Sequence, residues 1–350
     1  MTSIELPAAA DFHVHLRDGS MMETVVPTIK KGGVSLVYVM PNLVPPITTV
    51  EQALSYHARL QAIDSSVTYM MTLYLSPEIT PAVIAEAAKT NEIFGVKSYP
   101  KGLTTNSESG VVSYTQYYPV FAAMEEHDLV LNLHGESPSS ETTTVLNAEE
   151  TFLPTLFDIH EKFPKLRIVL EHCTTAAAVE AVKKCGPTVA ATITAHHLYL
   201  TIDQWADNPH CFCKPVAKLP SDRAALVKAA TSGNPKFFLG TDSAPHPKSA
   251  KVGTATGKTA AGVFTQPYAV QYIATAFDRA GRVDMLKGFA CDFGRAFYKI
   301  VEKGLGSKDG GVIVLSKDPG VVVVDTIGAG EGVVVPFHAG EKIWGLQWKA

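Results

Sequence analysis

Two histidines, His13 and His15, form an H-x-H motif at the end of a strand-like apolar run near the start of the chain. Side chains two residues apart on a β-strand point to the same side, so both imidazoles can face one metal ion. Other ligand-type residues end apolar runs in the same way: His134 ends LVLNLH, His172 follows LRIVLE and Asp242 follows KFFLGT. This repeated placement predicts a metal-dependent hydrolase.

Lys97 also ends an apolar run, IFGVK. A lysine with an ordinary pKa of about 10.4 is a cation and cannot bind a metal. If burial and neighbouring metals lower that pKa, the amine can take up carbon dioxide and become a carbamate with one oxygen for each of two metals. We therefore predict a carboxylated Lys97 that bridges two metals about 3.5–4 Å apart. The alternative is a surface lysine at the rim of the fold.

Eight short apolar runs alternate with amphipathic stretches. The runs are almost continuously hydrophobic, as expected for strands covered on both faces. This rhythm predicts an α/β fold, a (β/α)8 TIM barrel whose strand ends carry the candidate ligands. A doubly wound sheet competes, but no GxGxxG follows the first run. The predicted strands are 8–15, 34–40, 67–75, 93–98, 129–134, 166–171, 187–194 and 236–241, and the predicted helices between them are 51–62, 81–89, 115–127, 149–162, 174–185 and 221–231.

The remainder of the chain predicts a short C-terminal extension. Residues 245–262 are rich in Gly, Ser, Thr and Lys and predict a long loop after the eighth strand. Helices are expected at 266–279 and 283–303. The Gly- and Val-rich tail, 310–348, holds short strand-like pieces but is too short for an independent domain. We expect residues 1–350 to form a single domain.

Composition excludes several classes of function. The net charge of -4 favours neither a nucleic-acid surface nor an acidic tail. No run of about 18 apolar residues suggests a membrane span, and the N-terminus does not resemble a secretion signal. The five cysteines are odd in number and contain no CxxC pair, which favours free thiols. A cytoplasmic protein with no nucleic-acid or membrane partner is expected.

Seven segments resemble the motifs of the dihydroorotase family, the cyclic amidases of pyrimidine biosynthesis within the amidohydrolase superfamily. The resemblance runs from about residue 8 to 300 and looks closest to the shorter, monofunctional type. It implies zinc-dependent, reversible cyclisation of N-carbamoyl-L-aspartate to L-dihydroorotate in de novo synthesis of UMP. The segments are DFHVHLRDG, VYVMPN, GVKSYP, LNLHGE, LEHCT, HCFCKPVAK and GTDSAPH.

The resemblance also assigns the metals. Two Zn²⁺ ions per subunit are implied, the first on His13, His15 and Asp242. The second is implied on His134 and His172, with carboxylated Lys97 spanning both. By this reading a metal-bridging hydroxide attacks the ring amide, and Asp242 acts as general base and then as general acid.

A second set of residues is implied to bind the substrate, a small anion, and a homodimer is implied as well. Thr104 and Thr105 match a mobile loop that closes over the substrate, and the glycines on either side of them make a lid plausible. An arginine offers a planar fork for a carboxylate, to which an amide and an imidazole add neutral donors. Backbone groups are implied to contact the ring near Lys214 and at Ala261 and Gly262. The implied side-chain contacts to the substrate carboxylate are Arg17, Asn42 and His246.

Two alternatives stay open. One is another cyclic amidohydrolase, of hydantoinase, dihydropyrimidinase or allantoinase type. Those relatives carry a small β-sandwich built from both termini, whereas His13 lies almost at the N-terminus, so we expect no N-terminal strand of that kind. The other is a non-catalytic scaffold, which should lack a ligand, whereas none is missing here.

Three local features are not assigned a functional role. The pair His196 and His197 is read as local packing rather than a third metal site. Cys211 and Cys213 are assigned to the local strand and loop. The segment 247–260 is longer and richer in lysine than the family pattern requires.

Overall fold

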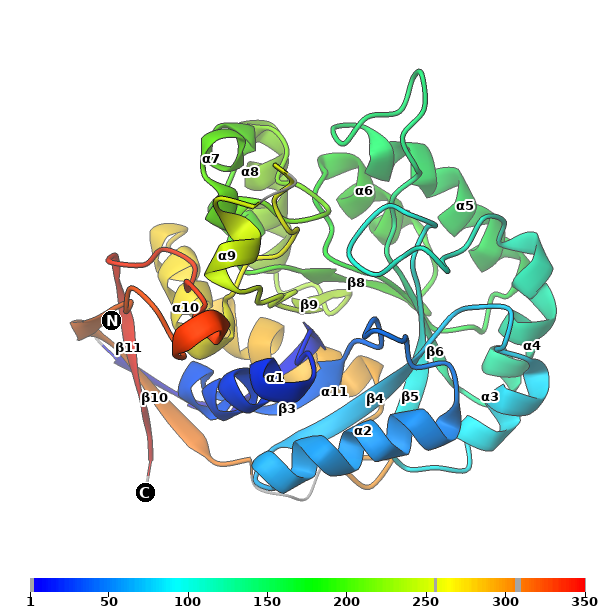
Figure 1. The fold of residues 1–350 in the computed structure, drawn as a ribbon, viewed down its shortest axis with the longest axis horizontal. Coiled ribbons are helices and arrows are strands. Elements are labelled where there is room, and N and C mark those ends of the chain that lie inside the picture. Colours follow the sequence, from blue (N-terminus) through cyan, green and yellow to red (C-terminus); the bar gives the residue numbers. More distant parts are fainter. Residues whose placement is uncertain (1–2, 255–256, 306–309, 350) are drawn as a thin grey trace.

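The computed structural model describes residues 3–254, 257–305 and 310–349, and its centre is a closed barrel of eight parallel strands (Figure 1). Each strand pairs with the next one along the chain, from β2 to β9. The barrel closes where the Asp242 amide donates to the His13 carbonyl (2.9 Å) and the His15 amide to that of Ser243 (3.0 Å). The predicted TIM barrel is confirmed. Its strands are β2 (Ala9–Val14), β3 (Val34–Val39), β4 (Thr68–Tyr74), β5 (Ile93–Ser98), β6 (Val130–Leu133), β7 (Ile168–Leu170), β8 (Val189–Ile193) and β9 (Phe237–Leu239).

Alternating side chains of each strand fill two separate parts of the core. In β3, Val37 and Val39 face the surrounding helices, whereas Leu36 and Tyr38 belong to the cluster inside the barrel. This alternation is the period of a strand, and both faces are buried, which is why the strands read as continuous apolar runs. Tyr298 fills the end of the barrel away from the candidate ligands, where its ring stacks on Phe12 at 4.8 Å.

Helices cover the outside of the barrel, and some of them, α2 (Val50–Ile63), α3 (Pro81–Ala87) and α6 (Ala176–Lys184) among them, begin with a threonine whose side chain caps the first turn. At α2 the Gln52 amide donates to the Thr49 hydroxyl, and the Thr49 amide to the Gln52 side chain, both at 3.2 Å. Three short helices were not predicted: α1 (Gly19–Val25), α7 (Ile202–Asp207) and α9 (Lys248–Lys251). The last forms one turn inside the predicted loop 245–262, of which residues 255–256 lie outside the described residues. The remaining barrel helices are α2 (Val50–Ile63), α3 (Pro81–Ala87), α4 (Tyr118–Glu126), α5 (Ala148–Lys162), α6 (Ala176–Lys184), α8 (Pro220–Ala230) and α10 (Ala269–Arg279).

The predicted helix at 283–303 is confirmed from 283 to 297, but it is irregular and ends six residues early. The helical run begins with a 3₁₀ turn (Val283–Met285), widens to a π-turn (Gly288–Asp292) and ends with a short helix, α11 (Phe293–Phe297). It runs across the closed end of the barrel, where Gly294 lies so close to the Phe12 ring that a Cβ would stand 2.2 Å from it. The wide turn and the early end of α11 let the chain insert Tyr298, which a regular helix would place differently.

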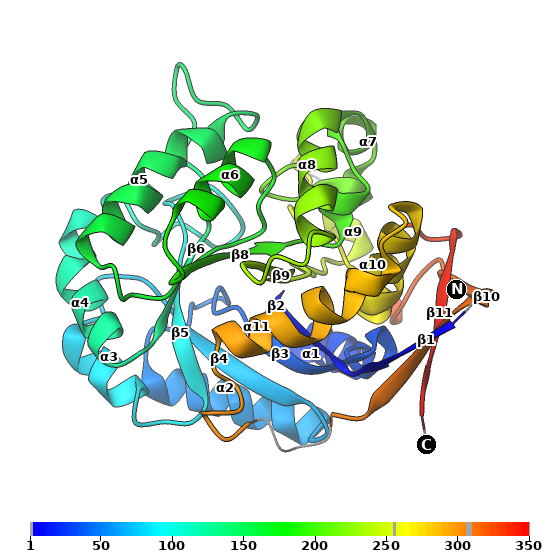
Figure 2. The same cartoon turned by 180° about the vertical axis from the view of Figure 1, so that it is seen from behind.

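The expectation that no N-terminal strand precedes His13 is also wrong. β1 (Ser3–Pro7) pairs antiparallel with β10 (Val312–Val322), which pairs with β11 (Lys342–Trp348) (Figure 2). The C-terminal extension is therefore a three-stranded sheet built from both ends of the chain. It packs beside α10, where the Trp344 amide donates to the Thr275 hydroxyl at 3.1 Å. Within the described residues, no helix has the length and apolar character needed to cross a bilayer.

Candidate metal centre

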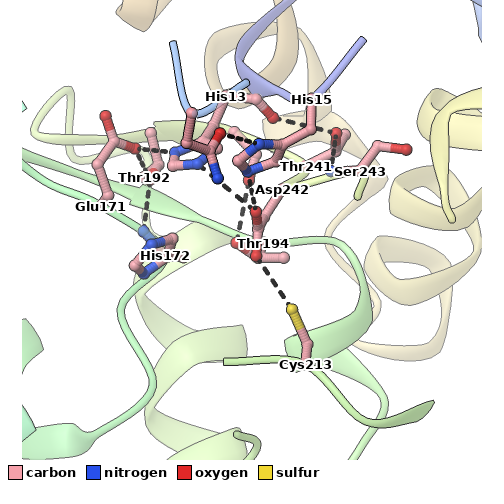
Figure 3. Close-up of polar contacts among 12 residues, drawn as sticks. His13, His15, Glu171, His172, Thr192, Thr194, Cys213, Thr241, Asp242 and Ser243 are labelled. Carbon is pink, nitrogen blue, oxygen red and sulfur yellow. Dashed lines mark hydrogen bonds and ion pairs between the residues drawn. The ribbon is translucent and has the colours of Figure 1, made fainter. Parts of the chain in front are cut away.

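His13, His15 and Asp242 converge at the carboxyl end of the barrel (Figure 3). The Nε2 atoms of His13 and His15 lie 3.5 and 3.1 Å from Oδ1 of Asp242. The Nδ1 atom of each ring has a hydrogen-bond partner: His13 Nδ1 donates to Glu171 (2.7 Å), and His15 Nδ1 donates to Asn42 (2.8 Å). With the proton on Nδ1, each ring directs the lone pair of Nε2 at the same carboxylate oxygen, an arrangement that a cation between them would stabilise.

The other three predicted ligands lie beside this group. The ring of His172 is 5.0 Å from that of His13 and 4.7 Å from that of His134. The Lys97 side chain is fully buried, with its Nζ 5.0 Å from the Tyr99 ring centroid. In the described part of the chain, that amine has no hydrogen-bond partner. The structure thus brings all six predicted ligand residues to one end of the barrel.

Burial sets the protonation of these groups in the direction that metal binding needs. It lowers the pKa of Lys97 to about 8, although the Glu171 and Asp242 carboxylates oppose the shift. It also lowers the pKa of His15 to about 4 and that of His172 well below its ordinary value. Burial raises the pKa of Asp242, yet the contact with Nε2 of His15 and the neighbouring histidine rings outweigh it and hold that pKa well below its usual range. Neutral imidazoles, an anionic carboxylate and a partly neutral lysine form a donor set that fits zinc.

Two buried carboxylates orient the histidines, and neither was predicted. Glu171 accepts hydrogen bonds from His13 Nδ1, from the Asn132 amide (2.6 Å) and from the Thr192 hydroxyl (2.6 Å). Glu136 lies 3.2 Å from Nε2 of His134. A carboxylate behind a metal-binding histidine fixes its tautomer and raises its basicity. Both residues lie within segments quoted for the family resemblance, LEHCT and LNLHGE, and their position one or two residues from a ligand was the available signal.

The backbone at two predicted ligands lies in the left-handed region. His172 has φ 40° and Asp242 has φ 48°, values that cost energy for residues other than glycine. Hydrogen bonds hold both turns: the His172 amide donates to the Thr192 hydroxyl at 2.6 Å. Asp11, buried in the barrel, accepts from the Thr241 amide (2.8 Å) and hydroxyl (2.6 Å). The strand ends are therefore fixed in the conformation that aims these side chains inward.

Arg17 and His246 lie together at the mouth of this site. Arg17 Nε donates to the Pro245 carbonyl (2.9 Å), and its Nη2 lies 3.1 Å from Nε2 of His246. Burial and the Arg17 charge lower the pKa of His246 to about 2, so its imidazole is neutral. The same His246 nitrogen is 2.9 Å from the Ala261 carbonyl, and the amide of Gly262 donates to the Phe212 carbonyl. Arg17 and Ala261 line the cavity, whereas His246 lies behind them.

The loop with Thr104 and Thr105 is folded down over the cavity. The Asn42 amide donates to the Thr105 carbonyl (3.1 Å), and Lys214 Nζ donates to the Leu103 carbonyl (2.8 Å). Asn42 therefore contacts His15 with its oxygen and the loop with its nitrogen. The free space left in the cavity is about 20 Å³, room for about one water molecule. This closed arrangement shuts the six-residue group away from solvent.

The likeness to known proteins agrees with this geometry. Residues 4–279 match the model of the amidohydrolase family. The chain is 58% identical over 351 residues to a Schizosaccharomyces pombe protein named "Probable dihydroorotase", covering 99% of this chain and 100% of that protein. It is 47% identical to the dihydroorotase of Saccharomyces cerevisiae, covering 99% and 98% of the two chains. A crystal structure of dihydroorotase from Saccharomyces cerevisiae in complex with 5-fluoroorotic acid superposes with a TM-score of 0.94 at 46% identity, covering 100% of this chain and 99% of that one. The chain therefore belongs to the dihydroorotase family of amidohydrolases, which hydrolyse cyclic amides.

Proposed function

We propose that this protein is a dihydroorotase that interconverts N-carbamoyl-L-aspartate and L-dihydroorotate in pyrimidine biosynthesis. The observation that carries the proposal is the group of six buried ligand-type side chains beside Arg17. A site for an uncharged ring has no need of a guanidinium at its mouth, whereas the carboxylate of dihydroorotate does. The relatives reported above bear the same name along almost their whole length.

Two zinc ions would be held by the residues that converge at the barrel mouth. His13, His15 and Asp242 would hold one, and His134 and His172 the other. We infer that Lys97 bridges them as a carbamate: its neutral amine adds to carbon dioxide, a C–N bond forms and one proton leaves. With a pKa of about 8, roughly a tenth of Lys97 is neutral at pH 7, enough for the reaction. When bound, the zinc ions supply Lewis acidity for the amide carbonyl and for the attacking water.

Asp242 would carry out the proton transfers. Its carboxylate faces the cavity and is held as an anion, so it can accept the proton of the attacking water as general base. The same group then donates this proton to the ring nitrogen as the amide C–N bond breaks. Cyclisation runs through the same groups in reverse, with Asp242 taking the proton of the carbamoyl nitrogen.

Substrate recognition would rest on residues around the cavity rather than on the charge of the whole protein. Arg17 would pair with the ring carboxylate, with Asn42 and neutral His246 fixing its orientation. Backbone groups of Lys214, Ala261 and Gly262 would contact the ring. Thr104 and Thr105, already folded over the site, would exclude water once the substrate is bound.

We further infer that residues 1–350 act as one domain, because Ile313 and Leu315 of the terminal sheet share one hydrophobic cluster with the barrel. A cytoplasmic homodimer is proposed on the family resemblance. The mass of the protein in solution, measured by light scattering, tests the dimer.

The decisive experiment compares purified protein on four substrates while bound metal is counted. Dihydroorotate should be turned over with two zinc ions per chain, and hydantoin, dihydrouracil and allantoin should not. Lys97→Ala should lose activity and metal, and short carboxylic acids that imitate the carbamate should restore part of both. Preference for an uncharged ring would overturn the substrate assignment. Full activity with two metals in Lys97→Ala would overturn the bridge.

A further inference from the structure

A second group of ligand-type side chains lies on the other side of Asp242. Cys213 Sγ donates to Oδ2 of Asp242 at 3.3 Å, whereas Oδ1 faces His13 and His15 (Figure 3). His196 completes the group: one ligand atom from each of His196, Cys213 and Asp242 lies within 4.8 Å of the others. All three side chains are buried. The carboxylate of Asp242 thus has one oxygen toward each group.

The packing around His196 does not account for the burial of its two ring nitrogens. Its ring packs 4.3 Å from that of His197 and 6.3 Å from that of Phe337, which agrees with the local packing expected from the sequence. Yet across the described ranges of the chain neither His196 nitrogen has a hydrogen-bond partner, although the residue is only 1% exposed. A buried imidazole N–H without a partner costs about 1–3 kcal/mol. Packing alone does not offset that cost, whereas a ligand bound between His196 and Cys213 would offset it.

We propose that His196, Cys213 and Asp242 form a third metal site, which takes a zinc-like ion and inhibits the enzyme. Thiolate and imidazole ligands select zinc and cadmium over magnesium or manganese, which prefer oxygen ligands. When the metal binds, the Cys213 S–H bond breaks, the metal–sulfur bond forms, and the thiol proton leaves to solvent. Three protein ligands leave a fourth, open position, as in other zinc sites of this ligand number.

The inhibition rests on the proposed function of Asp242. A metal on Oδ2 would replace the Cys213 hydrogen bond and hold the carboxylate between two cations. An aspartate fixed in this way can no longer take and return a proton. General acid–base catalysis contributes about 100-fold or more, so turnover should fall by about that factor when the site fills.

The test adds cadmium to the zinc-loaded enzyme and follows ultraviolet absorption, metal content and turnover together. The proposed catalytic zinc ligands are nitrogen and oxygen atoms, so cadmium there gives no thiolate-to-metal charge-transfer band. We expect such a band, a third equivalent of metal and a loss of turnover at the same cadmium concentration. Magnesium should produce none of these effects.

Two variants and one control identify the ligands. Cys213→Ser should abolish the band, and His196→Gln, which keeps every cysteine, should weaken cadmium binding by more than about tenfold. Cys211→Ser, the matched control two residues away and more exposed, should keep both band and affinity. No band in the unaltered enzyme, or a band lost with Cys211 rather than Cys213, would overturn the site. A band at Cys213 without inhibition would support the metal site but overturn its inhibitory effect and contradict the proton-transfer role of Asp242.

Discussion

Glu171→Gln is the substitution that most directly tests how the histidines are held. Glu171 is fully buried and accepts three hydrogen bonds: from His13 and Thr192 on Oε2, and from Asn132 on Oε1. A glutamine has the same shape but only one accepting oxygen. Whichever way its amide turns, its NH₂ group must face at least one of these donors. The substitution therefore removes the charge behind His13 and leaves a buried donor unpaired.

The magnitude follows from these contacts. A hydrogen bond to a charged group is worth about 1.5–3 kcal/mol, and loss of a partner behind a metal-binding histidine weakens metal affinity by about 10–100-fold. Zinc affinity, measured by competition with a chelator, should fall by that factor, and excess zinc should restore most of the activity. Glu149→Gln is the control, since Glu149 is equally buried but bonds Thr174 and Thr175 rather than a histidine. Unchanged zinc affinity in Glu171→Gln, or an equal loss in the control, would refute the reasoning.

Three further predictions concern other charged groups. Lys251→Met removes hydrogen bonds of 2.7–2.9 Å to the backbone carbonyls of Phe212, Ala260 and Gly262, so the free energy of unfolding should fall by about 3 kcal/mol in denaturant titration; an unchanged midpoint would contradict this. Arg17→Met should raise KM for dihydroorotate by about 10–100-fold while metal content stays constant, and an unchanged KM would remove Arg17 from the substrate site. Because burial lowers the pKa of Lys97 to about 8, its neutral fraction rises roughly tenfold between about pH 6 and pH 7. Reactivation of metal-free protein by zinc at constant dissolved carbon dioxide should accelerate by that factor, and a rate independent of pH would argue against the carbamate.

The barrel was predictable because its strands are buried on both faces. That burial favours apolar residues at most positions, and in β5 the predicted bounds 93–98 match those of the structure. The same reasoning could not find β1, whose residues SIELP bury only Leu6. Its strand exists because β10 supplies a partner more than 300 residues away. Likewise, the interruption of helix 283–303 follows from the need to close the barrel with Tyr298, which no local pattern shows.

The candidate ligands were predictable for a different reason: they stand where apolar runs stop. Their orienting partners were not, because a polar residue inside a run is ambiguous. Asn132 interrupts LVLNLH two positions before His134, and the strand period places both on one face. In the structure Asn132 donates to Glu171 and accepts from Tyr38 (2.9 Å), a network that joins three strands. Its meaning depends on neighbours that are far away in sequence.

The backbone conformation at His172 and Asp242 is the feature of the site that the sequence predicts least. β7 ends at Leu170 and β9 at Leu239, so His172 and Asp242 stand beyond their strands, each with a positive φ. Neither is a glycine, and local propensity argues against the left-handed region at both. Hydrogen bonds to other strands stabilise these turns: the Thr192 hydroxyl of β8 accepts from the His172 amide, and Asp11 of β2 accepts from the amide of Thr241, beside Asp242. Because each strained turn is held by a different strand, the ligand positions depend on closure of the whole barrel, and a change at Thr192 or Asp11 should disturb the metal site without touching a ligand.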